Sequence, residues 1–199
     1  MSSLNERVVV KRDGSTQIFN KTKIERWAKY AAKHDVDWCL VADSTIARLP
    51  KRVSTEEVHE TMINVCLDME QLEYSRVAAR LLYAKLRKNM SVIGITDRQT
   101  FKEIHSKFTG LKLWNSVEYD VGMEQQYTEL FKTKLEYWQI KQWMDKYSLQ
   151  YGNEPVETPH MGALALGYAV HGNSTLAFDL AKAVIRGQIN LPTPALNGI

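Results

Sequence analysis

The chain has 199 residues, of which 44% are hydrophobic, 25% charged and 10% aromatic, with a formal net charge of +3. This is the composition of an ordinary globular protein, and it gives no sign of a repeat array or of long disordered segments. The small positive excess gives no reason to expect a nucleic-acid partner. Cys39 and Cys66 form no CxxC pair, which argues against a disulfide framework and a zinc ribbon. Since no apolar run approaches the ~18 residues that span a membrane and the N-terminus lacks a leader pattern, we expect a cytoplasmic protein without a membrane partner.

The first predicted element is a basic β-hairpin. Runs of β-prone residues flank Asp13-Gly14, a strong short signal for a two-residue type I′ turn. Glycine adopts a positive φ at little cost, and aspartate tolerates it. Lys11 and Arg12 stand at the mouth of the predicted turn.

Helical signals predict about four helices after the hairpin. Asn20 can cap the first, whose inward stripe includes Trp27. Ser54 and Glu57 form a capping box at the start of another. The predicted spans are 21–33, 44–49, from 55 onward and 73–88.

The charge run at 87–89 and the stretch 91–95 indicate a boundary, and the sequence changes character from Thr96. The predicted domains are 1–92 and 93–199. Aromatic and long polar residues then indicate amphipathic helices. A turn and two apolar helices follow, over 151–155, 158–170 and 174–186. The chain is therefore predicted to be mainly α-helical.

Four cations of the first domain could converge on a polyphosphate, namely Lys11, Arg12, Lys23 and Lys88. Phosphate recognition favours several cations acting together. Thr55 and His59 would add donors near a helix N-terminus, which is itself an anion site. On spacing alone, solvated surface cations and a structural histidine remain the alternative.

No other motif assigns chemistry. The sequence contains no P-loop, GxGxxG or HExxH motif, and no Ser/His/Asp set or placed carboxylate pair. Aromatic residues interleaved with lysine between 100 and 150 could stack on bases, but such residues far more often form the cores of amphipathic helices. We therefore predict no catalytic residue and no metal ligand in this chain.

The hairpin and the capped helix together resemble the ATP-cone, the regulatory domain at the front of many ribonucleotide reductases. The residues that carry this likeness are 9–14, 19–20, 23–24, 55–60, 78–81 and 86–88. The tail at 189–194, with Gly198, is similar to the segment that enters the barrel of the class I large (alpha) subunit. The resemblance implies a mainly α fold: a cone of one hairpin and about four helices, then a helical region leading into an incomplete ten-stranded α/β barrel.

The resemblance also implies roles for individual residues. The cone would bind ATP or dATP as an allosteric effector, accompanied by Mg²⁺, with no metal or prosthetic group of its own. The phosphates would be held by Lys11, Arg12 and Lys88. The base would be bordered by Val9, Gln17 and Asn20, and the pocket completed by Lys23, Thr55 and His59. Some family members carry Glu where this chain has Gln17, which leaves the discrimination between ATP and dATP open.

The rest of the family's apparatus is expected beyond Ile199. Thr193 matches a position that touches the substrate nucleoside diphosphate, whereas Cys39 and Cys66 match no catalytic cysteine. The chain is thus expected to be the N-terminal part of a ribonucleoside-diphosphate reductase, from a split gene or a truncation. Its implied partners are the remainder of the large subunit, the small radical-generating (beta) subunit, and thioredoxin or glutaredoxin through the missing part. The interface with the complementing chain is predicted near Leu191 and on the apolar faces of residues 158–188.

Three alternatives to this reading stay open. A stand-alone ATP-cone regulator or repressor would resemble a zinc ribbon fused to a cone, and the four cysteines of such a ribbon are lacking. An anaerobic-type reductase also begins with a cone, but the Pro192-Thr193-Pro194 tail favours the aerobic class. A helical interaction module would bind no nucleotide at all.

Overall fold

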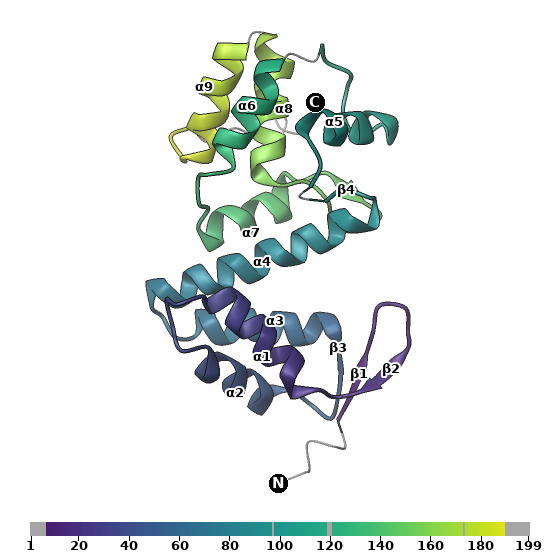
Figure 1. Ribbon diagram of the computed structural model, residues 1–199, viewed down its shortest axis with the longest axis vertical. Helices are drawn as coiled ribbons and strands as arrows, with labels where there is room; N and C mark the ends of the chain where they lie inside the picture. The colour runs from purple at the N-terminus through teal and green to yellow at the C-terminus, as the bar shows by residue number, and fades with distance from the viewer. Residues whose placement is uncertain (1–6, 97, 119–120, 173, 190–199) are drawn as a thin grey trace. The chain divides into compact units, whose positions relative to one another are not determined.

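The structure is a computed structural model that describes residues 7–96, 98–118, 121–172 and 174–189. It is mainly α-helical, as predicted (Figure 1). The chain forms two compact units, Met1–Leu82 and Tyr83–Ile199. The predicted barrel segment lies outside the described residues.

A three-stranded sheet with the order β2-β1-β3 opens the first unit. β1 (Val8–Val10) pairs antiparallel with β2 (Thr16–Ile18), which confirms the hairpin. It also pairs in parallel with β3 (Arg52–Ser54), a strand that the sequence analysis missed. Three residues are too few to show an alternating pattern, and β3 forms its ladder only through a long-range contact.

The hairpin turn differs from the predicted type I′ turn. The Gly14 amide donates to the Lys11 carbonyl at 3.0 Å, and the Lys11 amide donates to the Ser15 carbonyl at 2.8 Å. Gly14 has a φ of 78°, whereas Asp13 is not left-handed, so the loop is a type I turn followed by a left-handed glycine. The physical reason is local: Asp13 Oδ1 accepts from the amide and the hydroxyl of Ser15, at 2.9 and 2.6 Å. Both bonds also lower the pKa of Asp13, and the bond from the Ser15 hydroxyl has the larger effect.

Two of the predicted helix starts in this unit are confirmed by their caps. Asn20 Oδ1 accepts from the Thr22 amide at 3.0 Å at the start of α1 (Lys21–Ala32). Ser54 and Glu57 form the predicted capping box at α3 (Thr55–Leu67), with bonds of 3.0 and 2.7 Å.

Two other helices of the first unit are longer than predicted. α2 (Trp38–Arg48) begins well before residue 44 because Asp37 caps it, accepting from the Cys39 amide at 2.8 Å. α4 (Leu72–Val92) continues past residue 88, where the predicted helix ends, and includes the charged residues at 87 and 88. Charged side chains do not end a helix unless a cap or a glycine accompanies them.

Burial in the first unit follows the predicted stripes with one exception. The apolar residues of α4 that belong to this unit are buried, namely Tyr74, Val77, Ala78, Leu81 and Leu82. On α1, however, Trp27 is 43% exposed, so its assignment to the core was wrong. Its ring packs edge-on against His59 of α3 and Tyr30 of its own helix, with centroid distances of 5.7 and 5.8 Å.

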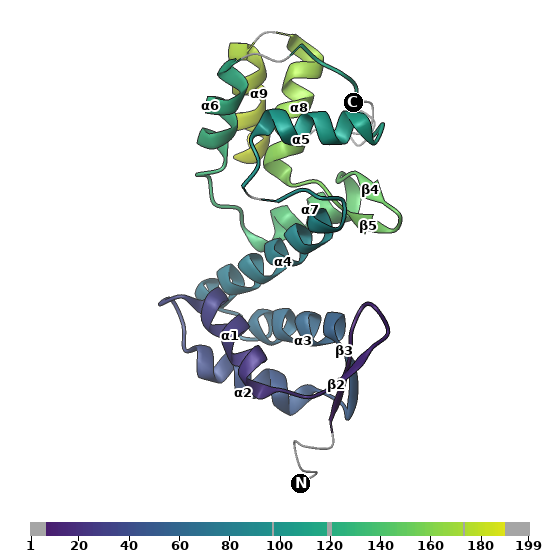
Figure 2. The same ribbon diagram turned by 45° about the vertical axis from the view of Figure 1, so that its right-hand side comes forward.

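The second unit is a helical assembly around a buried helix. Its elements after α4 are α5 (Phe101–Gly110), α6 (Val121–Leu130), α7 (Tyr137–Lys146), β4 (Gln150–Tyr151), β5 (Glu154–Pro155), α8 (Pro159–His171) and α9 (Ser174–Ile185). α6 and α9 pack against α8 (Figure 2). No helix in the described ranges is long and apolar enough to cross a membrane.

α8 corrects part of the predicted interface. Every residue from Pro159 to Tyr168 is buried within the unit, so this stretch offers no apolar face to a partner. Val170 and Leu176 remain exposed on these two helices, at 60% and 53%. Leu191, the other part of the predicted interface, lies outside the described residues.

Gly167 allows α8 and α9 to approach closely, and its replacement is expected to destabilise the second unit. A Cβ at position 167 would lie 2.3 Å from the Ala177 carbonyl oxygen, which belongs to the backbone of α9. We expect Gly167→Ala to cost about 1–3 kcal/mol of unfolding free energy, measured by urea denaturation. Gly110→Ala is the control: the added Cβ meets nothing within 4 Å and should leave stability unchanged or raise it slightly. Equal denaturation midpoints for both variants would contradict this view of the packing.

Candidate functional site

The parallel pairing of β1 and β3 brings a basic loop next to a helix N-terminus. Val10 is the partner of Ser54, so Lys11 and Thr55 leave the sheet at the same edge. Figures 1 and 2 both show the hairpin beside the start of α3. Lys11 and Arg12 are exposed, and Thr55 is half-buried. Because a helix N-terminus carries partial positive charge, this edge favours an anion.

A second part of the site lies along the sheet. Val9 and Gln17 are direct cross-strand partners, and their side chains therefore share one face. Val9 is buried and Gln17 is half-buried. Lys23, in the first turn of α1, donates from Nζ to Gln17 Oε1 at 3.0 Å. Lysine can only donate, so this bond fixes the orientation of the Gln17 carboxamide.

Asn20 and His59 have structural partners. Asn20 uses its side-chain oxygen as the cap of α1. His59 lies one turn after Thr55 on α3, and its Nε2 donates to the Leu81 carbonyl of α4 at 2.7 Å. One nitrogen of the imidazole thus joins α3 to α4, which is the role of a structural histidine.

Two predicted residues are not brought to this site by the structure. Lys88 is exposed on α4 and belongs to the second unit. Thr193 lies outside the described residues. The arrangement therefore rests on the eight predicted residues of the first unit: Val9, Lys11, Arg12, Gln17, Asn20, Lys23, Thr55 and His59.

Arg80 is a residue whose role the sequence analysis missed. Its Nη1 donates to the Ala31 carbonyl at 2.6 Å, and its Nη2 forms an ion pair with Asp35. The guanidinium thereby caps the C-terminus of α1. Arg80 falls outside the apolar stripe of α4 that Val77, Ala78 and Leu81 form, so no signal in the sequence indicated this contact.

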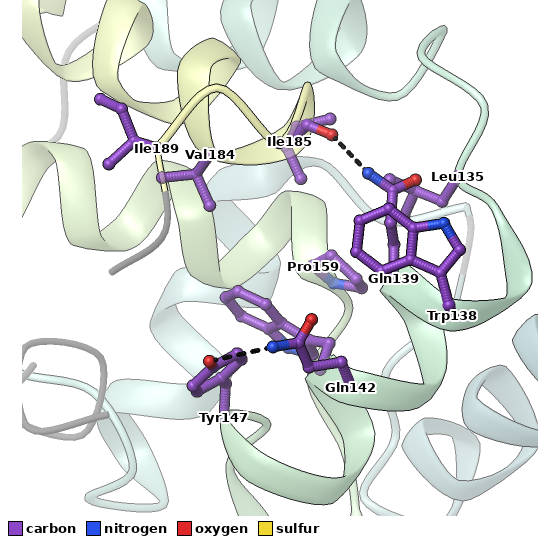
Figure 3. Close-up of a pocket in the computed structure, with 11 residues that line it drawn as sticks. Leu135, Trp138, Gln139, Gln142, Tyr147, Pro159, Val184, Ile185 and Ile189 are labelled. Carbon is purple, nitrogen blue, oxygen red and sulfur yellow. Dashed lines mark hydrogen bonds between the residues drawn. The ribbon is translucent and has the colours of Figure 1, made fainter. Parts of the chain in front are cut away.

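The second unit has a pocket of about 250 Å³ with different chemistry (Figure 3). Gln139 Nε2 donates to the Ile185 carbonyl at 3.1 Å, and Gln142 Nε2 donates to the Tyr147 hydroxyl at 3.3 Å. None of the described lining residues carries a charge at neutral pH, so the pocket does not suit a phosphate. They are Leu135, Trp138, Gln139, Gln142, Trp143, Tyr147, Pro159, Val184, Ile185, Gly187 and Ile189.

Metal chemistry has no candidate site within the part of the chain that the structure describes. There, no group of three or more His, Cys, Asp or Glu side chains could hold a metal ion. Burial raises the pKa of the Cys66 thiol to about 12, so this cysteine stays protonated at neutral pH. A reactive cysteine needs the opposite shift.

Comparison with known proteins addresses the first unit and α4. Residues 7–89 match the model of the ATP cone domain. This ATP cone match includes the three-stranded sheet, α1 to α3 and most of α4. The chain is also similar to ribonucleoside-diphosphate reductase 1 subunit alpha of Escherichia coli (strain K12), with 35% identity over 86 residues. The aligned stretch covers 41% of this chain and 11% of that subunit.

The C-terminal limit of the ATP cone match differs from the C-terminal limit of the first compact unit. The match runs to residue 89, whereas the first unit ends at Leu82, inside α4. The domain boundary predicted at residue 92 stays a prediction.

Proposed function

We propose that the first unit binds ATP or dATP as an allosteric effector. The observation that carries this proposal is the edge at which Lys11 meets the N-terminus of α3, within a segment that matches the ATP cone domain. Two cations and a helix N-terminus at one edge suit a polyphosphate, because charge-assisted hydrogen bonds add to the helix dipole.

The proposed ligand lies along the sheet. Lys11 and Arg12 hold its phosphates beside Thr55, with Mg²⁺ accompanying the nucleotide. The base lies toward Val9, Gln17 and Asn20, and Lys23 and His59 complete the pocket. Strand residues rise about 3.3 Å each, so Lys11 lies roughly 7 Å along the strand from Val9. An elongated ligand such as a nucleoside triphosphate suits this length. Lys88 is a further proposed phosphate contact.

We further propose that the chain is the N-terminal part of a ribonucleoside-diphosphate reductase large subunit. The similarity to the Escherichia coli subunit supports this assignment. In this proposal a cytoplasmic enzyme reduces ribonucleoside diphosphates with catalytic residues that lie outside this sequence. Thr193 contacts the substrate, the remaining large-subunit polypeptide supplies the barrel, and the beta subunit and thioredoxin or glutaredoxin are partners.

Calorimetric titration of the chain with ATP and with dATP tests the proposed binding. Saturable heat is expected for both nucleotides, together with a higher melting temperature, because a ligand that binds only the folded state stabilises it. Ribose 5-phosphate is a suitable control, since it offers one phosphate and no base. The absence of heat and of a thermal shift with either nucleotide would refute the proposal and favour the helical interaction module.

A further inference from the structure

Two adjacent residues of α4 hold both helices that begin at the candidate site. The Arg80 guanidinium donates to the Ala31 carbonyl at the end of α1. The next residue, Leu81, accepts with its carbonyl oxygen from His59 Nε2 of α3 at 2.7 Å. We call this pair of contacts the 80–81 clamp.

Several hydrogen bonds and an ion pair fix the Arg80 guanidinium in the clamp. Nε donates to the Arg76 carbonyl at 3.1 Å, which holds the guanidinium along α4. Nη1 reaches Ala31 at 2.6 Å and the Ala32 carbonyl at 3.4 Å, and Nη2 pairs with Asp35. The side chain is only 23% exposed. A planar fork can satisfy these acceptors together, whereas an ammonium group in its place could not.

The two clamped helices have their other ends at the candidate site. α1 begins at Asn20 and carries Lys23 in its first turn, and α3 begins at Thr55. A ligand that draws these N-termini together therefore acts on helices whose bodies are fixed to α4. α4 itself runs without a break from Leu72 to Val92, beyond the Leu82 end of the first unit.

We propose that Arg80 is a positioning residue that, with His59, couples occupancy of the nucleotide site to the C-terminal half of α4. The inference rests on the proposed function and deepens it. Nucleotide binding stiffens α1 and α3, the 80–81 clamp passes this constraint to α4, and local opening of the helix over residues 83–92 becomes rarer. Such coupling needs no change of shape, only a ligand that favours the ordered state.

Amide hydrogen exchange of residues 83–92, with and without saturating ATP, tests the coupling. In the unmodified chain ATP should slow exchange of this segment at least about fivefold, the lower end of typical coupling between sites. Arg80→Lys keeps the charge but loses the fork, and it should bind ATP within about threefold of the unmodified chain while losing the slowing. Arg76→Lys is the matched control on the same helix, with an exposed side chain, and should retain the slowing.

The outcomes separate the inference from the function on which it rests. The coupling is overturned if ATP gives binding heat in calorimetry but does not slow amide exchange over residues 83–92. It is also overturned if ATP slows this exchange equally in Arg80→Lys and in the unmodified chain. Either result leaves the proposed nucleotide site intact. Absence of ATP heat in the unmodified chain overturns both. A urea titration of each variant shows that it is folded, and the ATP-dependent change is compared within each variant, so a uniform loss of stability does not mimic lost coupling.

Discussion

Replacement of Lys11 by alanine is expected to weaken ATP binding at least about tenfold. Lys11 is exposed and leaves β1 beside the N-terminus of α3, so its ammonium group is placed to meet a phosphate there. A hydrogen bond between charged groups contributes about 1.5–3 kcal/mol, and 1.4 kcal/mol corresponds to a factor of ten in affinity. Lys88→Ala is expected to have a comparable effect. Isothermal calorimetry of each variant with ATP measures these losses.

Lys141→Ala is the control for these two variants. Lys141 is also an exposed lysine, but it lies on α7 and pairs with Asp145 of its own helix at 2.6 Å. Loss of such a surface pair changes stability by no more than about 1 kcal/mol and should leave ATP affinity unchanged. Similar affinities for all three alanine variants would mean that the basic hairpin does not hold the phosphates.

The second large effect is expected from a buried carboxyl group. Glu157 is 3% exposed in the second unit and accepts a hydrogen bond from Trp114 Nε1 at 2.8 Å. Burial raises its pKa to about 8, more than the Trp114 hydrogen bond lowers it. The folded chain therefore holds Glu157 as the neutral acid at pH 7, whereas the unfolded chain ionises it near pH 4.5.

This shift makes the stability of the second unit depend on pH. Because the folded pKa is raised, the contribution of Glu157 is fully present below about pH 4.5 and is lost as the pH rises toward 8. Each pKa unit corresponds to about 1.4 kcal/mol, so the loss amounts to several kcal/mol. Glu157→Gln stays neutral and keeps an oxygen for Trp114. At pH 5 we expect this variant and the unmodified chain to unfold at similar urea concentrations. At pH 8 the variant should unfold at a clearly higher urea concentration than the unmodified chain.

Two buried histidines of the same unit change its stability with pH in the opposite direction. Their effect is removed by comparing Glu157→Gln with the unmodified chain at each pH. Burial lowers the pKa of His160 to about 4 and also lowers the pKa of His105. Their contribution is present above about pH 6.5 and is lost as the pH falls toward the folded pKa values. It is the same in the unmodified chain and in Glu157→Gln, so it cancels in the difference between them. Stability profiles that stay parallel from pH 5 to pH 8 would show that Glu157 is ionised in the folded chain.

Local signals in the sequence were enough to predict most helices. Ser54 and Glu57 predicted the start of α3 because a capping box depends only on residues three apart. Two apolar helices were predicted at α8 and α9 by their composition and flanking turn residues. These features arise from contacts within one or two turns of chain, which a sequence displays directly.

Long-range contacts account for what the sequence did not predict. β3 has three residues and becomes a strand only by pairing with β1. The meeting of Lys11 and Thr55 depends on that pairing, so the resemblance suggested their roles but no spacing rule could place them together. The burial of α8 and the role of Arg80 likewise depend on which helices pack against them. A helical stripe shows that a face is buried, but not what covers it.

Mapping of the ATP site by backbone amide chemical shifts tests the central claim most directly. Titration of the isotopically labelled chain with ATP should shift the amides of residues 9–23 and 54–59 in a saturable manner. The amides around the neutral pocket, from Leu135 to Tyr147, should not move. Shifts confined to that pocket, or none at saturating ATP, would contradict a nucleotide site at the β1–β3 edge.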